Sequence, residues 1–354
     1  ESGAPVGVDV RGGAPATRET DLLNPVNLVQ EAHAILLAGG SAFGLDAAAG
    51  VMEYLEENGI GFDVRVTRVP IVCGAALFDL TVGDHRVRPD KAMGYRACQN
   101  AYARECPQGC VGAGTGASVG KVLGMDRAMK SGLGCFALQV ETLKVGALVA
   151  VNCLGDVVDP QTGKKLAGLL NANLDGLDDT EAVMIQSFAD KKNLFSGNTT
   201  IGVVATNASF GKAQAAKVAS MAHNGYARTM RPAHSMVDGD TIFAVSTGGV
   251  EADLSVVGLL AARAMERAVI AAGDEPTLFA LHLPQEVRIA VTRAQLSRGA
   301  SGEAVFSTEG GLPTLRVFKE AREREYLELL RRECGGEIVR MLDVSGLSRS
   351  HLYA

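Results

Sequence analysis

The stretch LFSGNTTIGVVATNA, residues 194–208, joins a small polar loop to an apolar run. Ile201 to Ala205 consists of aliphatic and β-branched residues, which is typical of a buried strand. Gly197 and Asn198 come shortly before it, and both tolerate the left-handed backbone of a tight turn. The ordinary interpretation is therefore a turn that leads into a central strand. It leaves open why two threonines stand where the strand begins.

Thr199, the first of these threonines, has a second interpretation as a nucleophile. A threonine hydroxyl reacts poorly unless a base lies beside it, and the residue's own α-amine can be that base. The amine is free only if the peptide bond before Thr199 is cut. Its pKa of about 7.7 to 8.0 then suits proton transfer near neutral pH. A pliable Gly-Asn loop held by a rigid strand favours such a cut.

The composition indicates a compact layered protein. The chain has 354 residues, 47% of them hydrophobic, with 42 glycines and no tryptophan. A net charge of −6 with both signs mixed argues against general attraction to nucleic acids or membranes. No apolar run approaches the roughly 20 residues of a membrane helix. We expect a cytoplasmic protein that binds no membrane.

The cysteines and histidines do not indicate a metal site. The seven cysteines contain no C-x-x-C pair, which favours reduced thiols over a disulfide framework. Cys106 and Cys110 are only four residues apart in the sequence, but no second pair or nearby histidine completes a zinc site. The histidines lack metal-ligand spacing, and no serine lies in a G-x-S-x-G motif. We therefore expect no metal, no cofactor and no serine triad.

Two short motifs have both a structural and a functional interpretation. VGAGTGASVGKVLG, residues 111–124, lacks two features of a Walker loop, because Thr115 replaces a glycine and Val122 replaces the Ser or Thr after Lys121. A flexible loop that brings backbone amides and Lys121 to a site remains open. DGD, residues 238–240, is either a turn before a strand or a pair of carboxylates that orients a catalytic group or binds a cation.

Helix and strand patterns alternate along the chain without the regular spacing of βαβ units. Helices are expected at residues 27–37, 42–57, 212–223 and 256–272. The third is expected to end at the Asn224-Gly225 pair. Strands are expected at residues 69–82, 135–152, 201–205 and 241–246, with a turn near Thr142 dividing the second segment into two strands. This order favours an α+β fold built as a layered sandwich.

The residue composition changes near Asp274, where we expect a domain boundary between residues 1–273 and 274–354. Residues 321–333 are dense in Arg and Glu. The chain then ends in a helix pattern, a Ser345-Gly346 turn and the start of another helix, which is the outline of a helix-turn-helix.

Five separated motifs resemble those of the DmpA-type aminopeptidases, relatives of the β-peptidyl aminopeptidases and of the nylon-oligomer hydrolases. In chain order within residues 7–272 they are LLNPVNLVQEAHAILLAGGSAFGLDAAAGV, RPDKAMG, GAGTGASVGKVLG, GNTTIGVVATNA and DGDTIFAVSTG. The resemblance implies an αββα sandwich like that of N-terminal-nucleophile hydrolases. It also implies self-cleavage between Asn198 and Thr199, which frees Thr199 as the nucleophile.

The resemblance implies roles for further residues. Asn152, in VAVNCLG, matches an asparagine whose side-chain amide helps to hold the oxyanion, and such a donor is worth roughly 3 kcal/mol. Lys121 matches a lysine near the nucleophile. Asp238 and Asp240 match a pair of residues that contacts and orients it. Phe43 stands where the nylon hydrolases have a tyrosine, so any role of that hydroxyl is absent.

The two ends of the chain depart from this resemblance. The family's first strands would precede residue 1, so we expect them to be missing here. Residues 280–354 resemble the Fis-type C-terminal region of NtrC-like activators, with a helix-turn-helix that is truncated at Ala354. Any binding of DNA would involve residues 320–354, where balanced charges argue against strong attraction to phosphate.

These observations favour an autocatalytically processed amide hydrolase, an aminopeptidase or amidase acting on amino-acid amides, small peptides or related oligomers. We expect a homo-oligomer of cleaved protomers. One alternative is acyl transfer as in ornithine acetyltransferases, which share the fold type and an internal threonine nucleophile. The other is a transcriptional regulator whose hydrolase-like domain senses a small ligand.

Overall fold

The computed structural model describes residues 3–101, 106–189, 197–273, 326 and 331. The chain divides into two units, Glu1–Pro284 and Gln285–Ala354. The expected boundary at Asp274 and the expected helix-turn-helix lie outside the described residues, so both stay predictions. Among the described helices, none combines the length and the apolar character that crossing a membrane requires.

A five-stranded sheet forms the centre of the fold. Its strands, in spatial order, are β1 (Val6–Val10), β15 (Thr241–Val250), β13 (Ile201–Ala208), β10 (Leu143–Ala150) and β9 (Leu133–Val140). β13 and β15 run parallel, with Ile201 opposite Thr241. Because both strands begin at the same edge, the segments that precede them, residues 198–200 and 238–240, lie side by side.

A second, smaller sheet faces the first. It consists of β2 (Thr17–Arg18), β6 (Val72–Ala76) and β3 (Ala34–Ala38), in that order. Hydrophobic side chains fill the space between the two sheets, among them Cys73 from β6, Leu77 directly after it, and Ile201 and Phe243 from the large sheet. These side chains are fully buried. They fix the distance between the sheets and therefore the position of the segment that follows β6.

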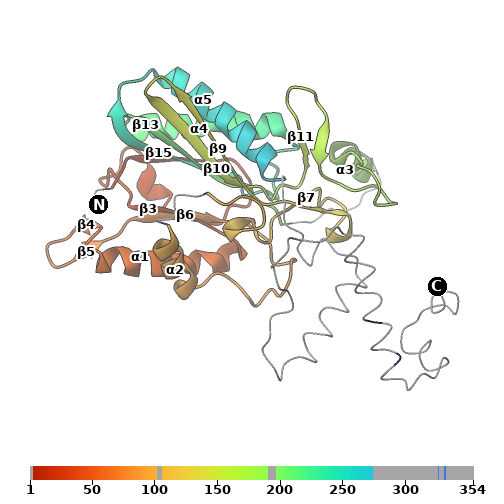
Figure 1. Ribbon diagram of the computed structural model, residues 1–354, viewed down its shortest axis with the longest axis horizontal. Coiled ribbons are helices and arrows are strands. Elements are labelled where there is room, and N and C mark those ends of the chain that lie inside the picture. Colours follow the sequence, from red (N-terminus) through yellow and green to blue (C-terminus); the bar gives the residue numbers. More distant parts are fainter. Residues whose placement is uncertain (1–2, 102–105, 190–196, 274–325, 327–330, 332–354) are drawn as a thin grey trace. The chain divides into compact units, whose positions relative to one another are not determined.

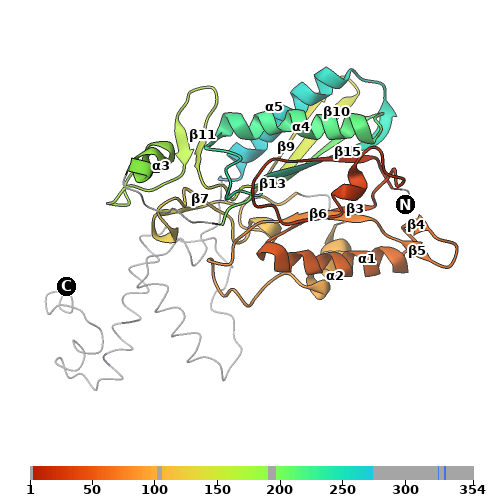
Figure 2. The same ribbon diagram turned by 180° about the vertical axis from the view of Figure 1, so that it is seen from behind.

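Helices cover the outer faces of both sheets (Figures 1 and 2). α4 (Lys212–Thr229) and α5 (Leu254–Ala271) pack on the large sheet, and α1 (Ala47–Glu57) packs on the small one beside α2 (Lys91–Asn100). The order of layers is helix, sheet, sheet, helix. The expected αββα sandwich is therefore confirmed.

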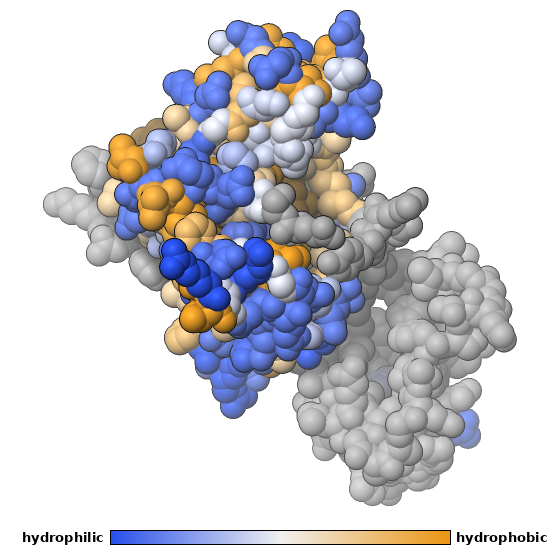
Figure 3. Space-filling view, turned by 90° about the vertical axis from the view of Figure 1, so that its left-hand side faces the viewer, coloured by the Kyte–Doolittle hydropathy of each residue, from blue (hydrophilic) through white to orange (hydrophobic). Residues whose placement is uncertain are grey.

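The remaining described strands and the remaining described α-helix are short and lie around this sandwich. They are β4 (Phe62–Asp63), β5 (Arg68–Val69), β7 (Ser118–Val119), β8 (Met129–Lys130), β11 (Asp156–Val158), β12 (Lys165–Ala167), α3 (Thr180–Ala189) and β14 (Met230–Arg231). Figure 3 shows the side of the molecule that carries the β4–β5 hairpin, where hydrophobic residues are scattered among hydrophilic ones. This pattern is ordinary for the surface of a folded domain.

The helix expected at residues 27–37 is absent, and the prediction was wrong. Residues 34–38 form strand β3, which pairs in parallel with β6. An apolar run of this length fits a buried strand as well as a helix, so periodicity cannot separate them. The residues before it form a loop whose backbone carbonyls converge on the buried Lys212 ammonium group, which donates to Leu22 O, Asn24 O, Asn27 O and Val29 O.

The expected helix end at Asn224-Gly225 was also wrong, because α4 continues to Thr229. Gly225 lies where α4 meets α5, and a Cβ atom there would lie 2.7 Å from Ala262 O and 2.8 Å from Met265 Cβ. The glycine therefore permits close approach of two helices instead of ending one of them.

Candidate active site

The polar loop before β13 brings Thr199 into the interior. Thr199 is 3% exposed, and its backbone N–H donates to Asn152 O over 3.1 Å. Its hydroxyl Oγ1 contacts Asn198 O, the carbonyl oxygen of the preceding peptide bond. The same oxygen accepts a hydrogen bond from Gly239 N at 3.1 Å. A hydroxyl and a backbone donor therefore meet at the carbonyl group of Asn198.

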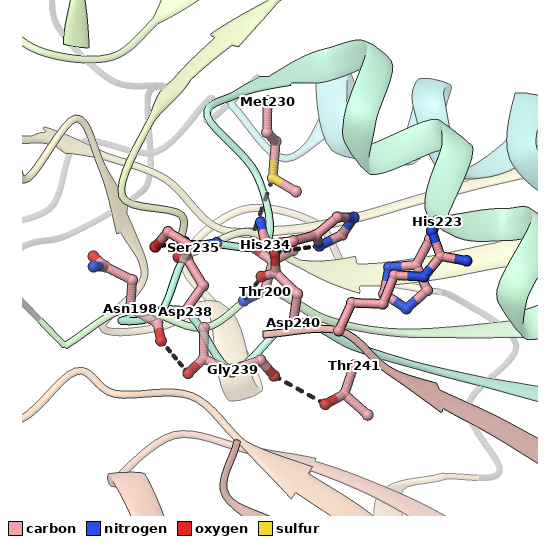
Figure 4. A network of polar contacts seen from close by, with 12 residues as sticks. Asn198, Thr200, His223, Met230, His234, Ser235, Asp238, Gly239, Asp240 and Thr241 are labelled. Carbon is pink, nitrogen blue, oxygen red and sulfur yellow. Dashed lines mark hydrogen bonds and ion pairs between the residues drawn. The ribbon is translucent and has the colours of Figure 1, made fainter. Parts of the chain in front are cut away.

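Gly239 fits this position because of its size. A Cβ atom there would lie 2.7 Å from Thr199 Oγ1 and 2.8 Å from Ala14 O. The glycine of the DGD motif therefore lets the backbone approach the threonine hydroxyl. This close approach also places the N–H of Gly239 on Asn198 O (Figure 4).

Lys121, from the glycine-rich stretch, is buried beside Asn152. Its Nζ donates to Asn152 Oδ1 over 2.7 Å and to Asn152 O over 3.0 Å. Burial lowers the pKa of Lys121 to about 7, although the charges of Asp238, Asp79 and Asp240 act in the opposite direction. Lys121 can therefore gain or lose a proton near neutral pH, which suits a group that takes part in proton transfer.

The side-chain amide of Asn152 does not contact the Asn198 carbonyl. Its Nδ2 donates to Phe78 O over 2.8 Å, in the segment that follows β6. Its Oδ1 accepts from Ser118 N at 3.0 Å and from Lys121. The expected role of Asn152 as an oxyanion donor therefore stays a prediction, and in this intact chain Asn198 O accepts from Gly239 N and from the Thr199 hydroxyl.

Asp238 and Asp240 flank Gly239 and are both 1% exposed. Asp240 Oδ1 accepts from Thr200 N over 3.0 Å. Asp238 accepts from the backbone and hydroxyl of Ser235 and, more weakly, from Leu154 N at 3.4 Å. Burial, and next the charge of Asp240, raise the pKa of Asp238 to about 6. Asp240 holds the residue after Thr199, whereas no hydrogen bond joins either carboxylate to Thr199 itself among the described contacts.

Two residues near Thr199 escaped the sequence analysis. The ring of Phe78 packs directly on Gly197, in the loop before Thr199. A Cβ atom on Gly197 would lie only 2.5 Å from the nearest carbon of this ring. His234 contacts Asp240 with both its backbone N and its ring Nδ1, each at 2.9 Å. The available signal for His234 was its position six residues before Asp240.

Phe43 lies on the surface rather than at Thr199. Its side chain is 57% exposed, and the guanidinium group of Arg88 lies 3.9 Å from the centre of its ring. This is a cation–π contact. Phe78, and not Phe43, is the aromatic residue that packs against the loop before Thr199.

The described residues contain no group of three or more His, Cys, Asp or Glu side chains with the geometry of a metal site. The groups gathered at Thr199 are instead a hydroxyl, a buried amine, two carboxylates and backbone donors. Groups of these kinds can carry out acyl transfer to a hydroxyl nucleophile.

The amino-acid sequence is similar to those of known hydrolases. The model of peptidase family S58 matches residues 1–285. An uncharacterized aminopeptidase of Mycobacterium leprae is 48% identical over 255 residues, which cover 69% of this chain and 68% of that protein. A 6-aminohexanoate-oligomer endohydrolase of Paenarthrobacter ureafaciens is 31% identical over 287 residues, which cover 77% of this chain and 78% of that protein.

The fold is similar to those of solved aminopeptidase structures. The L-aminopeptidase D-Ala-esterase/amidase from Ochrobactrum anthropi, described as a variant of the Ntn hydrolase fold, superposes with a TM-score of 0.52 at 18% identity, covering 85% of this chain and 84% of that one. A β-aminopeptidase from Burkholderia sp. has a TM-score of 0.52 at 19% identity, covering 76% and 73% of the two chains. These likenesses establish the fold.

Proposed function

The chain belongs to peptidase family S58 and is a hydrolase of the aminopeptidase or amidase type, and we propose that its nucleophile is Thr199, freed by self-cleavage. The observation that carries the proposal is the contact of Thr199 Oγ1 with Asn198 O, an oxygen that also accepts from Gly239 N. A nucleophile and an electrophile are thus neighbours in one peptide, and a backbone donor already lies on the oxygen that becomes negative.

The proposed cut proceeds in two steps. Thr199 Oγ attacks the carbonyl carbon of Asn198, and the C–N bond to Thr199 breaks. In net terms the hydroxyl proton moves to the leaving nitrogen, which becomes the free amine, and the acyl group moves from nitrogen to oxygen. Water then attacks the ester, which leaves a carboxylate on Asn198 and restores the Thr199 hydroxyl beside a free amine. That amine is the base for later turnovers.

Lys121 is suited to supply the proton to the leaving nitrogen. Its Nζ and the Thr199 nitrogen both donate to Asn152 O, at 3.0 Å and 3.1 Å, so the two nitrogens are neighbours. A pKa of about 7 makes Lys121 an effective proton donor and acceptor at neutral pH. In the cleaved protein the side-chain amine of Lys121 lies beside the new α-amine of Thr199.

The substrates we propose are amino-acid amides and short peptides with a free amino terminus. The support is that a relative at 48% identity is named an aminopeptidase. Amide oligomers are a second class, because the relatives at about 31% identity include hydrolases named for 6-aminohexanoate oligomers. None of these relatives is named as an acetyltransferase or a regulator, so neither alternative gains support from them.

The test is hydrolysis of amino-acid p-nitroanilides by the purified full chain. We expect release of nitroaniline, its loss in Thr199→Ala and its partial retention in Thr199→Ser. The matched control is Thr115→Ala, an exposed threonine in the glycine-rich stretch, which should keep full activity. Hydrolysis by Thr199→Ala at the wild-type rate would refute Thr199 as the nucleophile.

A further inference from the structure

Both oxygens of the Asp240 carboxylate are engaged in the interior. Oδ1 accepts from Thr200 N at 3.0 Å, in the peptide that follows Thr199. Oδ2 accepts from His234 N and contacts His234 Nδ1, each at 2.9 Å. Asp240 therefore connects His234 to the peptide next to Thr199 (Figure 4).

His234 has a backbone conformation that few residues other than glycine adopt. Its φ is +59°, in the left-handed region, where histidine, asparagine and aspartate are the commonest residues after glycine. This conformation lets the backbone N–H and the ring of one residue point at the same carboxylate oxygen. Residues held in sparsely populated conformations cluster at functional sites. The double contact with Asp240 accounts for this conformation at His234.

The hydrogen-bond partners of the ring nitrogens, and not the packing contacts of the ring, determine which nitrogen carries the proton. The ring packs edge-on against His223, with centroids 4.9 Å apart, and is tilted against Tyr226 at 6.4 Å. His234 Nε2 is buried and has no hydrogen-bond partner among the described residues, whereas Nδ1 faces the carboxylate of Asp240. A proton on Nδ1 is the arrangement that satisfies this contact, so Nδ1–H donates to Asp240.

We propose that His234 is a positioning residue that acts through Asp240 on the segment Thr199–Thr200. The Nδ1–H hydrogen bond stabilises the ionised carboxylate and fixes its orientation, because hydrogen bonds to an anion are strong and directional. The carboxylate in turn holds Thr200 N, and so the segment between the nucleophile Thr199 and the start of β13. Histidine–carboxylate pairs also occur at other catalytic sites, where the carboxylate orients the imidazole; here the imidazole orients the carboxylate. This inference rests on the proposed role of Thr199.

The test compares His234→Asn with His234→Gln. Asparagine can place its amide near the position of Nδ1 and tolerates positive φ, whereas glutamine places its amide near Nε2. We expect His234→Asn to retain self-cleavage and kcat within about threefold of wild type. In His234→Gln we expect both to fall roughly tenfold to a hundredfold, with KM changed by less than about threefold.

The control is His223→Phe, which removes the neighbouring imidazole but leaves the contact between His234 and Asp240. It should lower Tm and leave kcat unchanged. Equal kcat in the asparagine, glutamine and wild-type proteins would overturn the proposal, as would a tenfold loss in the asparagine variant or a loss in His223→Phe matching that of His234→Gln. Amide hydrolysis by Thr199→Ala at the wild-type rate would instead refute the proposed function, whatever the His234 variants do.

Discussion

Lys121 Nζ and the backbone nitrogen of Thr199 donate hydrogen bonds to the same atom, the carbonyl oxygen of Asn152, over 3.0 Å and 3.1 Å. One is a buried amine whose pKa lies near neutrality. The other is the nitrogen that must leave when the bond to Asn198 is cut. This shared acceptor brings together the glycine-rich stretch, the segment after β10 and the segment before β13.

Lys121→Met should slow self-cleavage. We expect a loss of about 10² to 10⁴ in rate, the usual contribution of a general acid or base. The measurement is the fraction of cut chain against time after refolding, read on a denaturing gel. Lys144→Met, at an exposed position on β10, is the control and should cleave normally. If both variants cleave at the wild-type rate, Lys121 takes no part in the reaction.

Lys121 should also make stability depend on pH. Burial lowers its pKa to about 7 in the folded chain, whereas the unfolded chain keeps its ordinary value of 10.5. Between these values the unfolded state binds the extra proton, so the free energy of unfolding rises with pH in this window and is level below it. Urea unfolding of Thr199→Ala at pH 7 and pH 9 measures the rise. Adding Lys121→Met should reduce it, and an unchanged rise would contradict the assignment.

Asp238 should have the opposite dependence at lower pH. Burial raises its pKa in the folded chain from 3.8 to about 6, so its stabilising contribution is complete below pH 3.8 and is lost as pH rises through 6. The loss is on the order of 3 kcal/mol, because one pKa unit corresponds to about 1.4 kcal/mol. We expect Asp238→Asn, compared with its parent in the Thr199→Ala background, to lack this decline between pH 4 and 6. A parallel decline in both proteins would show that other groups cause it.

Lys212→Met should destabilise the fold without altering the reacting groups. Its ammonium group donates to four loop carbonyls, two of them, Asn24 O and Val29 O, within 2.8 Å. Removal leaves buried acceptors unpaired, which should lower the free energy of unfolding by about 3 kcal/mol. Lys217→Met, at an exposed position on the same helix, is the matched control. Equal stability of the two variants would mean that the loop carbonyls find other donors.

The sequence predicted the elements whose pattern is governed by local chemistry. The hairpin of β9 and β10 turns at Glu141 and Thr142, as expected from the polar residues there. The prediction from the sequence failed where tertiary contacts determine the secondary structure. Residues 34–38 became a strand because β6 offers a parallel edge, and Gly225 lies within a helix because α5 packs against it.

The residues of the candidate site divide in the same way, into those that linear motifs predict and those that only tertiary contacts bring to the site. Linear motifs carried Lys121, Asn152, Asp238 and Asp240, and the parallel pairing of β13 with β15 brings the last two beside residues 198–200. His234 and Phe78 could not be found in this way. Their contacts depend on a left-handed backbone at His234 and on the packing of the small sheet's exit segment against Gly197, neither of which has a linear signature.

The cut before Thr199 is the central claim, and the mass of the purified full chain tests it most directly. We expect two fragments, residues 1–198 and 199–354, with the second beginning Thr-Thr-Ile-Gly, and a single intact chain for Thr199→Ala. A folded chain that stays in one piece and still hydrolyses amino-acid amides would contradict it.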